Sequence, residues 1–298
     1  MNPYMRAKKN APAPFPVLAG GAALRHWRET VLVMICLAML AGFMLRGPMA
    51  QNPAYHDFAD HRQFFDVPNL FDVASNLPFL IIGIAGIALV VSQGKPPLSE
   101  SWLMFFIGSV ATFFGSSYYH LAPSNETLVW DRLPMTVAFM AMFVALVHEH
   151  MGERLDRFLL VPAILLGLAS AVWWHVTDDL RLYFWVQFTP MVCIPVLLTL
   201  FPGRYTHRGD LLYGLGLYGL AKFAEIWDRQ IFALTGNTVS GHSLKHMFAA
   251  GALLVVLFML RRRERVAPVL CKRSVGDSWP KPVAISTAPI NGEHEAQS

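Results

Sequence analysis

The sequence is poor in charge, because Asp, Glu, Lys and Arg make up only 15% of its 298 residues. Soluble globular domains contain about 25% charged residues. The sequence is also poor in cysteine, and its three cysteines include no CxxC pair and give no even-numbered disulfide framework. It contains no glycine-rich phosphate loop, Walker motif or GxSxG elbow. These absences argue against an ordinary soluble enzyme and give no indication of nucleotide binding.

Hydrophobic residues are abundant instead, at 54% of the chain, and they lie in long runs. A helix of about 20 apolar residues crosses a hydrocarbon core of about 30 Å. Eight runs reach or approach this length: 30–46, 71–92, 102–119, 133–147, 158–174, 182–201, 211–226 and 247–260. The sequence therefore predicts an all-α fold, a polytopic bundle of membrane-spanning helices.

The two ends of the chain differ from its hydrophobic middle. Residues 1–29 are mostly polar and do not resemble a cleaved signal peptide, so we expect a cytoplasmic arm followed by a retained transmembrane helix at 30–46. Residues 264–298 are rich in Pro, Ser and charge and show no periodicity, which predicts a disordered cytoplasmic tail. The other seven runs lie between these ends.

The positions of Lys and Arg predict the orientation, since cytoplasmic segments of membrane proteins carry an excess of both. They gather before residue 30, at 154–157, at 204–208 and after 260, which assigns both termini to the cytoplasm. The non-cytoplasmic segments are then 47–70, 121–130, 175–181 and 228–241. Basic cytoplasmic loops suit a bacterial inner membrane, with these segments in the periplasm. The net charge of +4 therefore reflects topology and gives no indication of nucleic-acid binding.

Five residues capable of catalysis fall at the non-cytoplasmic ends of three predicted helices. Ser116 and His120 are four residues apart, and His242 and His246 share that spacing, which places each pair on one helix face. Asp131 stands where the next helix begins. The topology, derived from charge alone, brings three imidazoles, one carboxylate and one hydroxyl group to the same membrane face. Ionisable groups are costly inside spans and indicate function.

Three neutral imidazoles with one open position are the ligand set of a catalytic Zn²⁺, which lowers the pKa of a bound water to about 7. We therefore predict Zn²⁺ at His120, His242 and His246. Asp131 is the expected proton shuttle between that water and a leaving amine. Ser116 lies one turn deeper than His120, where its hydroxyl group would donate a hydrogen bond to an oxyanion.

This motif set resembles that of the alkaline ceramidase family, within the seven-helix membrane hydrolase superfamily that also includes progestin and adipoQ receptors. The family pattern S-x-x-x-H followed by D-x-L-P-M is similar to Ser116, His120 and the segment 131–135. The HxxxH of the family's last helix matches His242 and His246. The resemblance implies that these three histidines hold Zn²⁺ and that the serine and aspartate complete the catalytic site.

A further likeness lies at 73–77, where VASNL is similar to the T-x-S-N-L that opens the family's first core helix. The resemblance implies a seven-helix hydrolase domain at 55–261, to which the helix at 30–46 is an addition. It implies a membrane-embedded, zinc-dependent amide hydrolase that cleaves the N-acyl bond of ceramide-like lipids to a free fatty acid and a sphingoid base. The oligomeric state is not predicted.

Two alternatives share this scaffold: a hydrolase of another N-acyl or ester lipid, and a receptor-like seven-helix protein with structural zinc. Asp131 and Ser116 argue against the second, because a closed structural site needs neither a base nor an open position. A transporter is least favoured, since no paired broken helices recur in the two halves of the chain.

One segment departs from the family pattern. Eukaryotic members carry a calcium site built from D-W-C-E-x-N and a later glutamate, whereas HDFADHR stands here. Arg62 occupies the asparagine position and Asn69 that of the glutamate. Because a cation in place of a neutral ligand opposes Ca²⁺, we expect calcium to matter little and Arg62 to neutralise Asp57 or Asp60.

Other polar residues favour structural roles. Lys222 and Glu225, three residues apart, favour an ion pair inside the bundle over a proton path. His175, Asp178 and Asp179 lie close together in segment 175–179. We expect this segment to be a solvated loop rather than a second metal site. Tyr183 is expected to anchor the membrane interface, and Lys245 is expected to point away from the metal.

Overall fold

The computed structural model describes residues 26–92, 99–152 and 155–266. Within these ranges the chain forms helices and connecting loops without a strand, which confirms the predicted all-α fold. The elements are α2 (Trp27–Leu45), a short 3₁₀ helix η2 (Pro53–His56), α3 (Leu70–Ala74), α4 (Leu77–Ser92), α5 (Glu100–Leu121), α6 (Asn125–Met151), α7 (Leu155–Thr177), α8 (Arg181–Leu200), α9 (Asp210–Ile226), α10 (Asp228–Leu234) and α11 (Gly241–Arg262). Most of the predicted arm at 1–29 and of the predicted tail at 264–298 lies outside the described residues.

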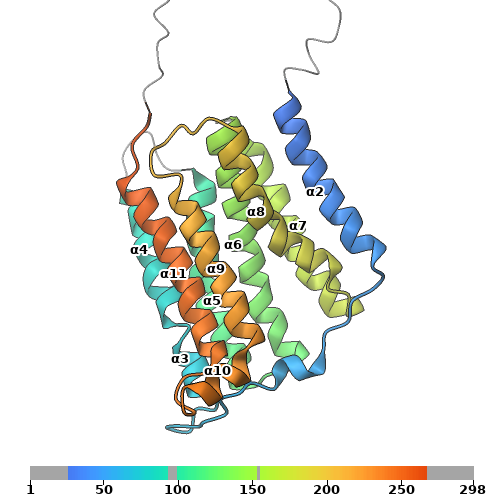
Figure 1. Ribbon diagram of the computed structural model, residues 1–298, viewed down its shortest axis with the longest axis vertical. Helices are drawn as coiled ribbons and strands as arrows, with labels where there is room; N and C mark the ends of the chain where they lie inside the picture. Colours follow the sequence, from blue (N-terminus) through green and yellow to red (C-terminus); the bar gives the residue numbers. More distant parts are fainter. Residues whose placement is uncertain (1–25, 93–98, 153–154, 267–298) are drawn as a thin grey trace, which may run out of the picture. The chain divides into compact units, whose positions relative to one another are not determined.

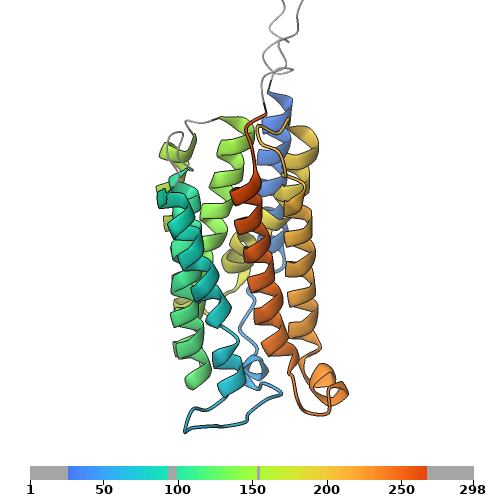
Figure 2. The same cartoon turned by 90° about the vertical axis from the view of Figure 1, so that its left-hand side faces the viewer.

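Each predicted hydrophobic run corresponds to a long helix (Figures 1 and 2). Six segments are long and apolar enough to cross a membrane, as expected of a multi-pass membrane protein: α2, α3 with α4, α6, α7, α8 and α11. Helices α5 and α9 run alongside these six, and α9 is shorter, at 17 residues. Helix α5 carries a buried polar row of Ser109, Thr112, Ser116 and His120, which faces the interior of the bundle.

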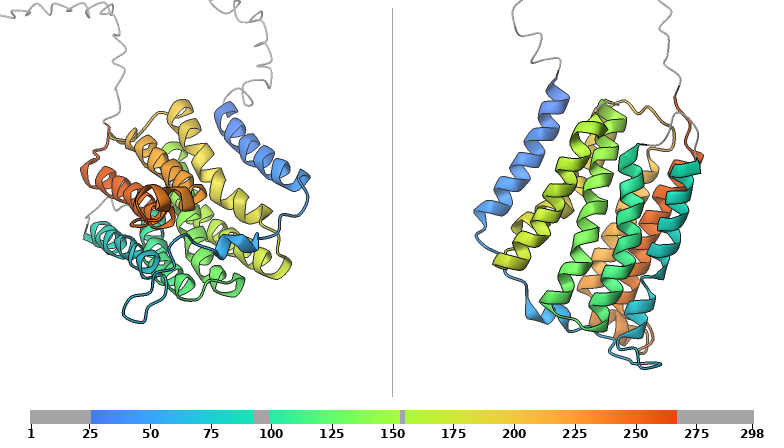
Figure 3. Two further views of the ribbon diagram at one scale, coloured as in Figure 1. Left: turned by 60° about the horizontal axis from the view of Figure 1, so that its bottom comes forward. Right: turned by 180° about the vertical axis from the view of Figure 1, so that it is seen from behind.

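Neighbouring helices along the chain pack as antiparallel pairs. Helix α5 packs against α4 and α6, α6 packs against α7, and α9 packs against α11 (Figure 1). Helix α2 lies at the edge of the bundle against α8, and Leu32 is its buried residue (Figure 3). This peripheral place is compatible with an addition to a seven-helix domain, a division that stays a prediction.

Two helices begin earlier than their hydrophobic runs because polar residues cap them. Ser124 and Thr127 form a capping box at the start of α6, in which each side chain accepts from the backbone N–H of the other. Asp131 consequently lies in the second turn of α6 rather than at its end. Ser240 caps α11 by accepting from the backbone N–H of Ser243, so His242 and His246 fall in the first two turns of α11.

Candidate active site

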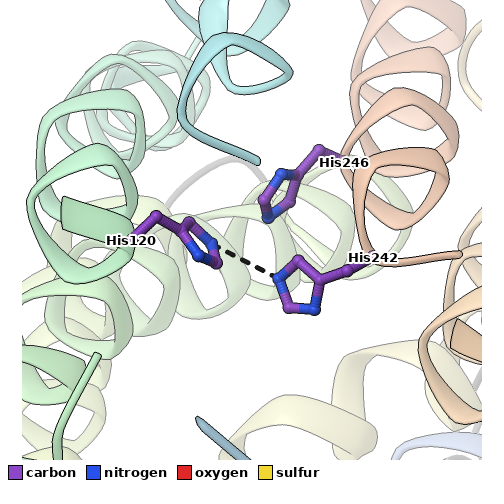
Figure 4. Close-up of side chains that lie close together, drawn as sticks. All are labelled: His120, His242 and His246. Atoms are coloured by element: carbon purple, nitrogen blue, oxygen red, sulfur yellow. Dashed lines mark hydrogen bonds between the residues drawn. The ribbon is translucent and has the colours of Figure 1, made fainter. Parts of the chain in front are cut away.

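His120, His242 and His246 meet at one end of the bundle, where the last turn of α5 faces the start of α11. All three are buried, with at most 3% of each exposed. Their candidate ligand atoms all lie within 4.8 Å of one another, so together they could hold a metal ion. Figure 4 shows the three rings gathered around a common point, with the contact between His120 and His242 dashed.

The nitrogen positions fit a tetrahedral ion. Nε2 of His120 and Nε2 of His242 lie 3.3 Å apart. Two nitrogens that each stand about 2.0–2.1 Å from a tetrahedral zinc ion are separated by about 3.3 Å. The third ligand candidate, Nε2 of His246, is buried and has no hydrogen-bond partner among the described residues. A buried polar atom of this kind is an expected metal ligand.

Ser75 orients the ring of His246 and determines which of its nitrogens carries the proton. The Ser75 hydroxyl group donates to the backbone oxygen of Asp72 at 2.9 Å and lies 2.7 Å from Nδ1 of His246. Since the hydroxyl proton is already donated, Nδ1 must be the donor to Ser75, which leaves Nε2 unprotonated. Hydrogen bonds of this type commonly orient metal-ligating histidines. The segment VASNL contained this residue, but its contact with α11 depends on the fold.

The start of α11 is held in place by α10 and by the loop before α3. The Asp228 carboxylate accepts hydrogen bonds from the backbone N–H groups of His242 and Ala59, each with a nitrogen–oxygen distance of 2.8 Å. Gly241 allows the close approach, because a Cβ atom there would collide with the backbone of Ala224 and Asp228. The position of His242 is therefore coupled to the loop between η2 and α3.

Phe58 in that loop covers the histidines. Its ring centroid lies 4.4 Å from that of His242 and 4.8 Å from that of His120, and only 2% of the residue is exposed. An apolar cover of this kind excludes water from one side of a metal site. Sequence analysis missed Phe58, because a single aromatic residue in an aperiodic loop gives no signal of its target.

Asp57 and Asp60 of the same loop are each paired with a guanidinium group. Arg62 forms a bidentate pair with Asp60, at 2.8 and 2.6 Å, and Arg229 pairs with Asp57. The prediction that Arg62 neutralises one of the two acids is thus confirmed for Asp60. Burial raises the pKa of the Asp60 carboxyl group, but the hydrogen bonds and charge of Arg62 outweigh burial and leave the pKa lowered. Arg62 also donates to the backbone oxygen of Thr238, which joins this loop to the one before α11.

These pairs predict that calcium does not stabilise the protein. Both carboxylates that could bind Ca²⁺ already have a cationic partner, and Arg62 would repel the ion. We expect the melting temperature of the purified protein to be unchanged by micromolar Ca²⁺. A clear rise in melting temperature that disappears in Asp57→Ala would show that this segment binds calcium after all.

Ser116 and Asp131 lie beside the histidines on neighbouring helices. Both residues are buried, and both line the same cavity as His246. Gly115 makes this proximity possible, since a Cβ atom there would collide with the backbone oxygen of Trp130. Small residues permit such close helix contacts in membranes.

The close contact at Gly115 leads to a testable prediction. Gly115→Ala forces α5 away from α6, and overpacking of this kind costs about 1–3 kcal/mol. We expect a lower melting temperature and reduced turnover, because Ser116 moves relative to Asp131. Gly216→Ala is the matched control, since a Cβ atom there meets nothing within 4 Å. Equal melting temperatures and activities for the two variants would contradict this role of Gly115.

A cavity of about 560 Å³ extends from these residues into the bundle. Ser116, Asp131 and His246 line its polar end, whereas His242 lines a smaller polar pocket of about 250 Å³ and His120 is fully buried. The cavity continues past apolar side chains as far as Val256, three turns further along α11 and about 15 Å away. The cavity is therefore polar near His246 and largely apolar toward Val256.

Charged side chains also line the cavity. Lys222 and Glu225 form the predicted ion pair at 2.9 Å. The expectation for Lys245 was wrong: its flexible side chain folds back so that Nζ lies 2.8 Å from Nε2 of His242 and 3.4 Å from Glu225. A metal ion bound by the histidines would repel the Lys245 ammonium group. The Lys245 side chain would then move toward the Glu225 carboxylate, which it already contacts. Tyr55 holds this carboxylate with a hydrogen bond of 2.9 Å.

Segment 175–179 is exposed at His175 and Asp178, as predicted, but the interpretation as a solvated loop was wrong for Asp179. Asp179 is 4% exposed and pairs with Arg181. Hydrogen bonds from Arg181 lower the pKa of the Asp179 carboxyl group to about 2. Asp179 and Asp178 also accept the backbone N–H groups of Met49 and Gln51. They therefore fix the linker between α2 and η2, part of which lines the cavity.

Tyr183 is 3% exposed and lines the cavity, so it is not the membrane-interface anchor that the sequence suggested. The helix start at Arg181 places the tyrosine on the inner face of α8, among residues of α6 and α7. Its ring lies beside Arg132, which also lines the cavity.

Comparison with known proteins supports the motif assignment. The ceramidase family model matches residues 66–209, which include Ser116, His120 and Asp131 but end before α11. No curated protein matches the chain. Ceramidases hydrolyse an amide bond in a lipid, associate with membranes and are generally metal-dependent. The fold brings His242 and His246, which lie beyond the matched segment, next to His120, and the match supports assignment of the chain to the ceramidase family.

Proposed function

We propose that the protein is a membrane-embedded, zinc-dependent amide hydrolase that cleaves the N-acyl bond of ceramide-like lipids to a free fatty acid and a sphingoid base. The observation that carries this proposal is the cluster of His120, His242 and His246, of which His246 lines the polar end of a largely apolar cavity. The neighbouring carboxyl and hydroxyl groups of Asp131 and Ser116 supply what hydrolysis of an amide needs beyond a metal ion.

The side chains of this end have separable roles. When bound by the three histidines, Zn²⁺ supplies Lewis acidity and a water molecule of low pKa. Asp131 takes a proton from the attacking water and delivers it to the leaving nitrogen. Ser116 donates a hydrogen bond to the carbonyl oxygen as negative charge develops on it. Ser75 keeps Nε2 of His246 unprotonated, and Phe58 keeps bulk water from His120 and His242.

Product analysis tests the reaction. Purified full-length protein in detergent is incubated with a long-chain ceramide, and lipids are quantified by mass spectrometry with and without a chelator. We expect equal amounts of fatty acid and sphingoid base, loss of both with the chelator, and recovery with Zn²⁺. An ester lipid of the same acyl chain serves as the comparison. Cleavage of the ester alone would favour the alternative lipid hydrolase, and no cleavage of either would favour a structural metal site.

We further propose that the site opens to the non-cytoplasmic side, the periplasm if the membrane is a bacterial inner membrane. The loop at 201–209 and the basic end of α11 lie at the end of the bundle opposite to α3, α10 and the histidines (Figure 1). The positive-inside rule assigns this basic end to the cytoplasm.

Thiol labelling measures the orientation. In a background lacking Cys36, Cys193 and Cys271, single cysteines replace Glu126 and Gly209, both exposed and at opposite ends of the bundle. We expect an impermeant thiol reagent to label Glu126→Cys but not Gly209→Cys in intact cells, and both after lysis. The reverse pattern in intact cells would invert the proposed topology.

A further inference from the structure

Arg132 is a buried cation in the wall of the proposed lipid cavity. It follows Asp131 in α6, is only 5% exposed and lines the cavity near its polar end. A guanidinium group inside a membrane-embedded bundle is costly and almost always has a partner or a function.

The described neighbours of Arg132 are mostly neutral rings. Its guanidinium carbon lies 3.9 Å from the ring centroid of Trp174, 4.7 Å from that of Tyr183 and 5.8 Å from that of Tyr55. Its Nη2 atom donates to the side-chain oxygen of Gln51 at 2.6 Å. The rings stabilise a cation from the sides and keep the planar group in one orientation.

The guanidinium group nevertheless lacks an anionic partner within the described residues. Its Nη1 atom is buried without a hydrogen-bond acceptor, and no ion pair joins Arg132 to a described carboxylate. The partly buried cations of the bundle differ: Lys222, Lys245 and Arg263 each lie within 3.4 Å of a carboxylate oxygen. The guanidinium group of Arg132 is therefore surrounded by aromatic rings beside the cavity, and its Nη1 atom has no described hydrogen-bond acceptor.

We propose that Arg132 binds an anionic oxygen group of the lipid that occupies the cavity. The inference rests on the proposed function, because that function places a lipid there. A planar guanidinium group donates two parallel hydrogen bonds to a carboxylate or a phosphate, and dry surroundings strengthen them. Two sources share this chemistry: the carboxylate of the released fatty acid and an anionic headgroup on the N-acyl lipid.

Equilibrium binding to lipid pairs tests the proposal and separates the two sources. The affinity of full-length protein in detergent is measured for two pairs of lipids, each with one anionic and one neutral member. The pairs are palmitate with hexadecanol and ceramide 1-phosphate with ceramide, at a pH at which the acids are ionised. A chelator is present so that no metal ion binds the anion, and a parallel series contains Zn²⁺. We expect the anionic member of at least one pair to bind about 10- to 100-fold more tightly. The pair that shows the preference identifies the source.

Variants assign the preference to Arg132. Arg132→Gln should remove most of it without changing the affinity for the neutral lipid, and Arg132→Lys should retain part of it. Arg46→Gln removes an exposed arginine from the proposed non-cytoplasmic end and should retain all of it. A purely structural role, such as holding Gln51, would lower the melting temperature but leave the ratio of affinities unchanged.

Two results would overturn the proposal: no preference for either anionic lipid in the wild-type protein, or an unchanged preference in Arg132→Gln. The first needs no variant, so it holds even if Arg132→Gln does not fold. In the chelator series, binding is measured without turnover. A failure of this proposal therefore leaves ceramide hydrolysis intact, and a failure of hydrolysis leaves the charge preference measurable.

Discussion

Replacing His242 with alanine is expected to remove the bound metal ion and, with it, amide hydrolysis. Three buried imidazoles converge within 4.8 Å, and loss of one leaves two protein ligands for an ion that needs three. Loss of a residue that merely orients a ligand weakens metal binding by about 10- to 100-fold, so loss of a ligand should cost more. We expect one Zn²⁺ per wild-type chain and almost none in the variant after dialysis.

Elemental analysis of the purified proteins measures this effect. His148→Ala is the control, because His148 is a half-buried histidine near the other end of α6 and lies outside the cavity. It should retain both zinc and turnover. Stoichiometric zinc in His242→Ala would refute the site formed by the three histidines.

Asp131→Asn is expected to keep zinc and to lose turnover by about 10²–10⁴-fold, the usual contribution of general acid–base catalysis. The amide has nearly the same shape as the carboxylate but cannot accept and return a proton. Asp131 lines the cavity with Ser116 and His246 without belonging to the metal-binding group. The variant should therefore separate the proton transfer from metal binding.

Steady-state hydrolysis of a ceramide, together with zinc content, measures both quantities in each variant. Asp210→Asn, at the far end of the bundle in α9, is the matched control and should hydrolyse normally. Near-wild-type hydrolysis by Asp131→Asn would remove this carboxylate from the mechanism. Loss of zinc from Asp131→Asn would instead indicate a structural role near the metal.

The long helices and the positions of the five candidate site residues could be predicted because they follow regular patterns in the sequence. Hydrophobic runs of membrane length determine the helices, since backbone groups in lipid must be satisfied within the chain. The four-residue spacing of Ser116 with His120 and of His242 with His246 predicts shared helix faces. The distribution of Lys and Arg then suggested that these faces meet at one end, and the fold brings them together there.

The surroundings of these residues could not be predicted, because loops and long side chains determine them. Phe58 comes from an aperiodic loop, and Ser75 reaches His246 only because α3 ends beside α11. Lys245 was misplaced because helical spacing gives the direction of Cβ but not the path of four further rotatable bonds. Arg132 was overlooked because its neighbours come from distant segments of the chain.

A metal titration of the metal-free protein tests most directly whether the three histidines form a catalytic zinc site. Chelator-treated full-length protein receives Zn²⁺ in increments, and bound zinc and ceramide cleavage are measured in the same samples. Because three imidazoles leave one coordination position for water, we expect turnover to rise in proportion to bound zinc and to reach its maximum at one ion per chain. Full turnover without zinc, or full zinc binding without turnover, would contradict a catalytic role for His120, His242 and His246.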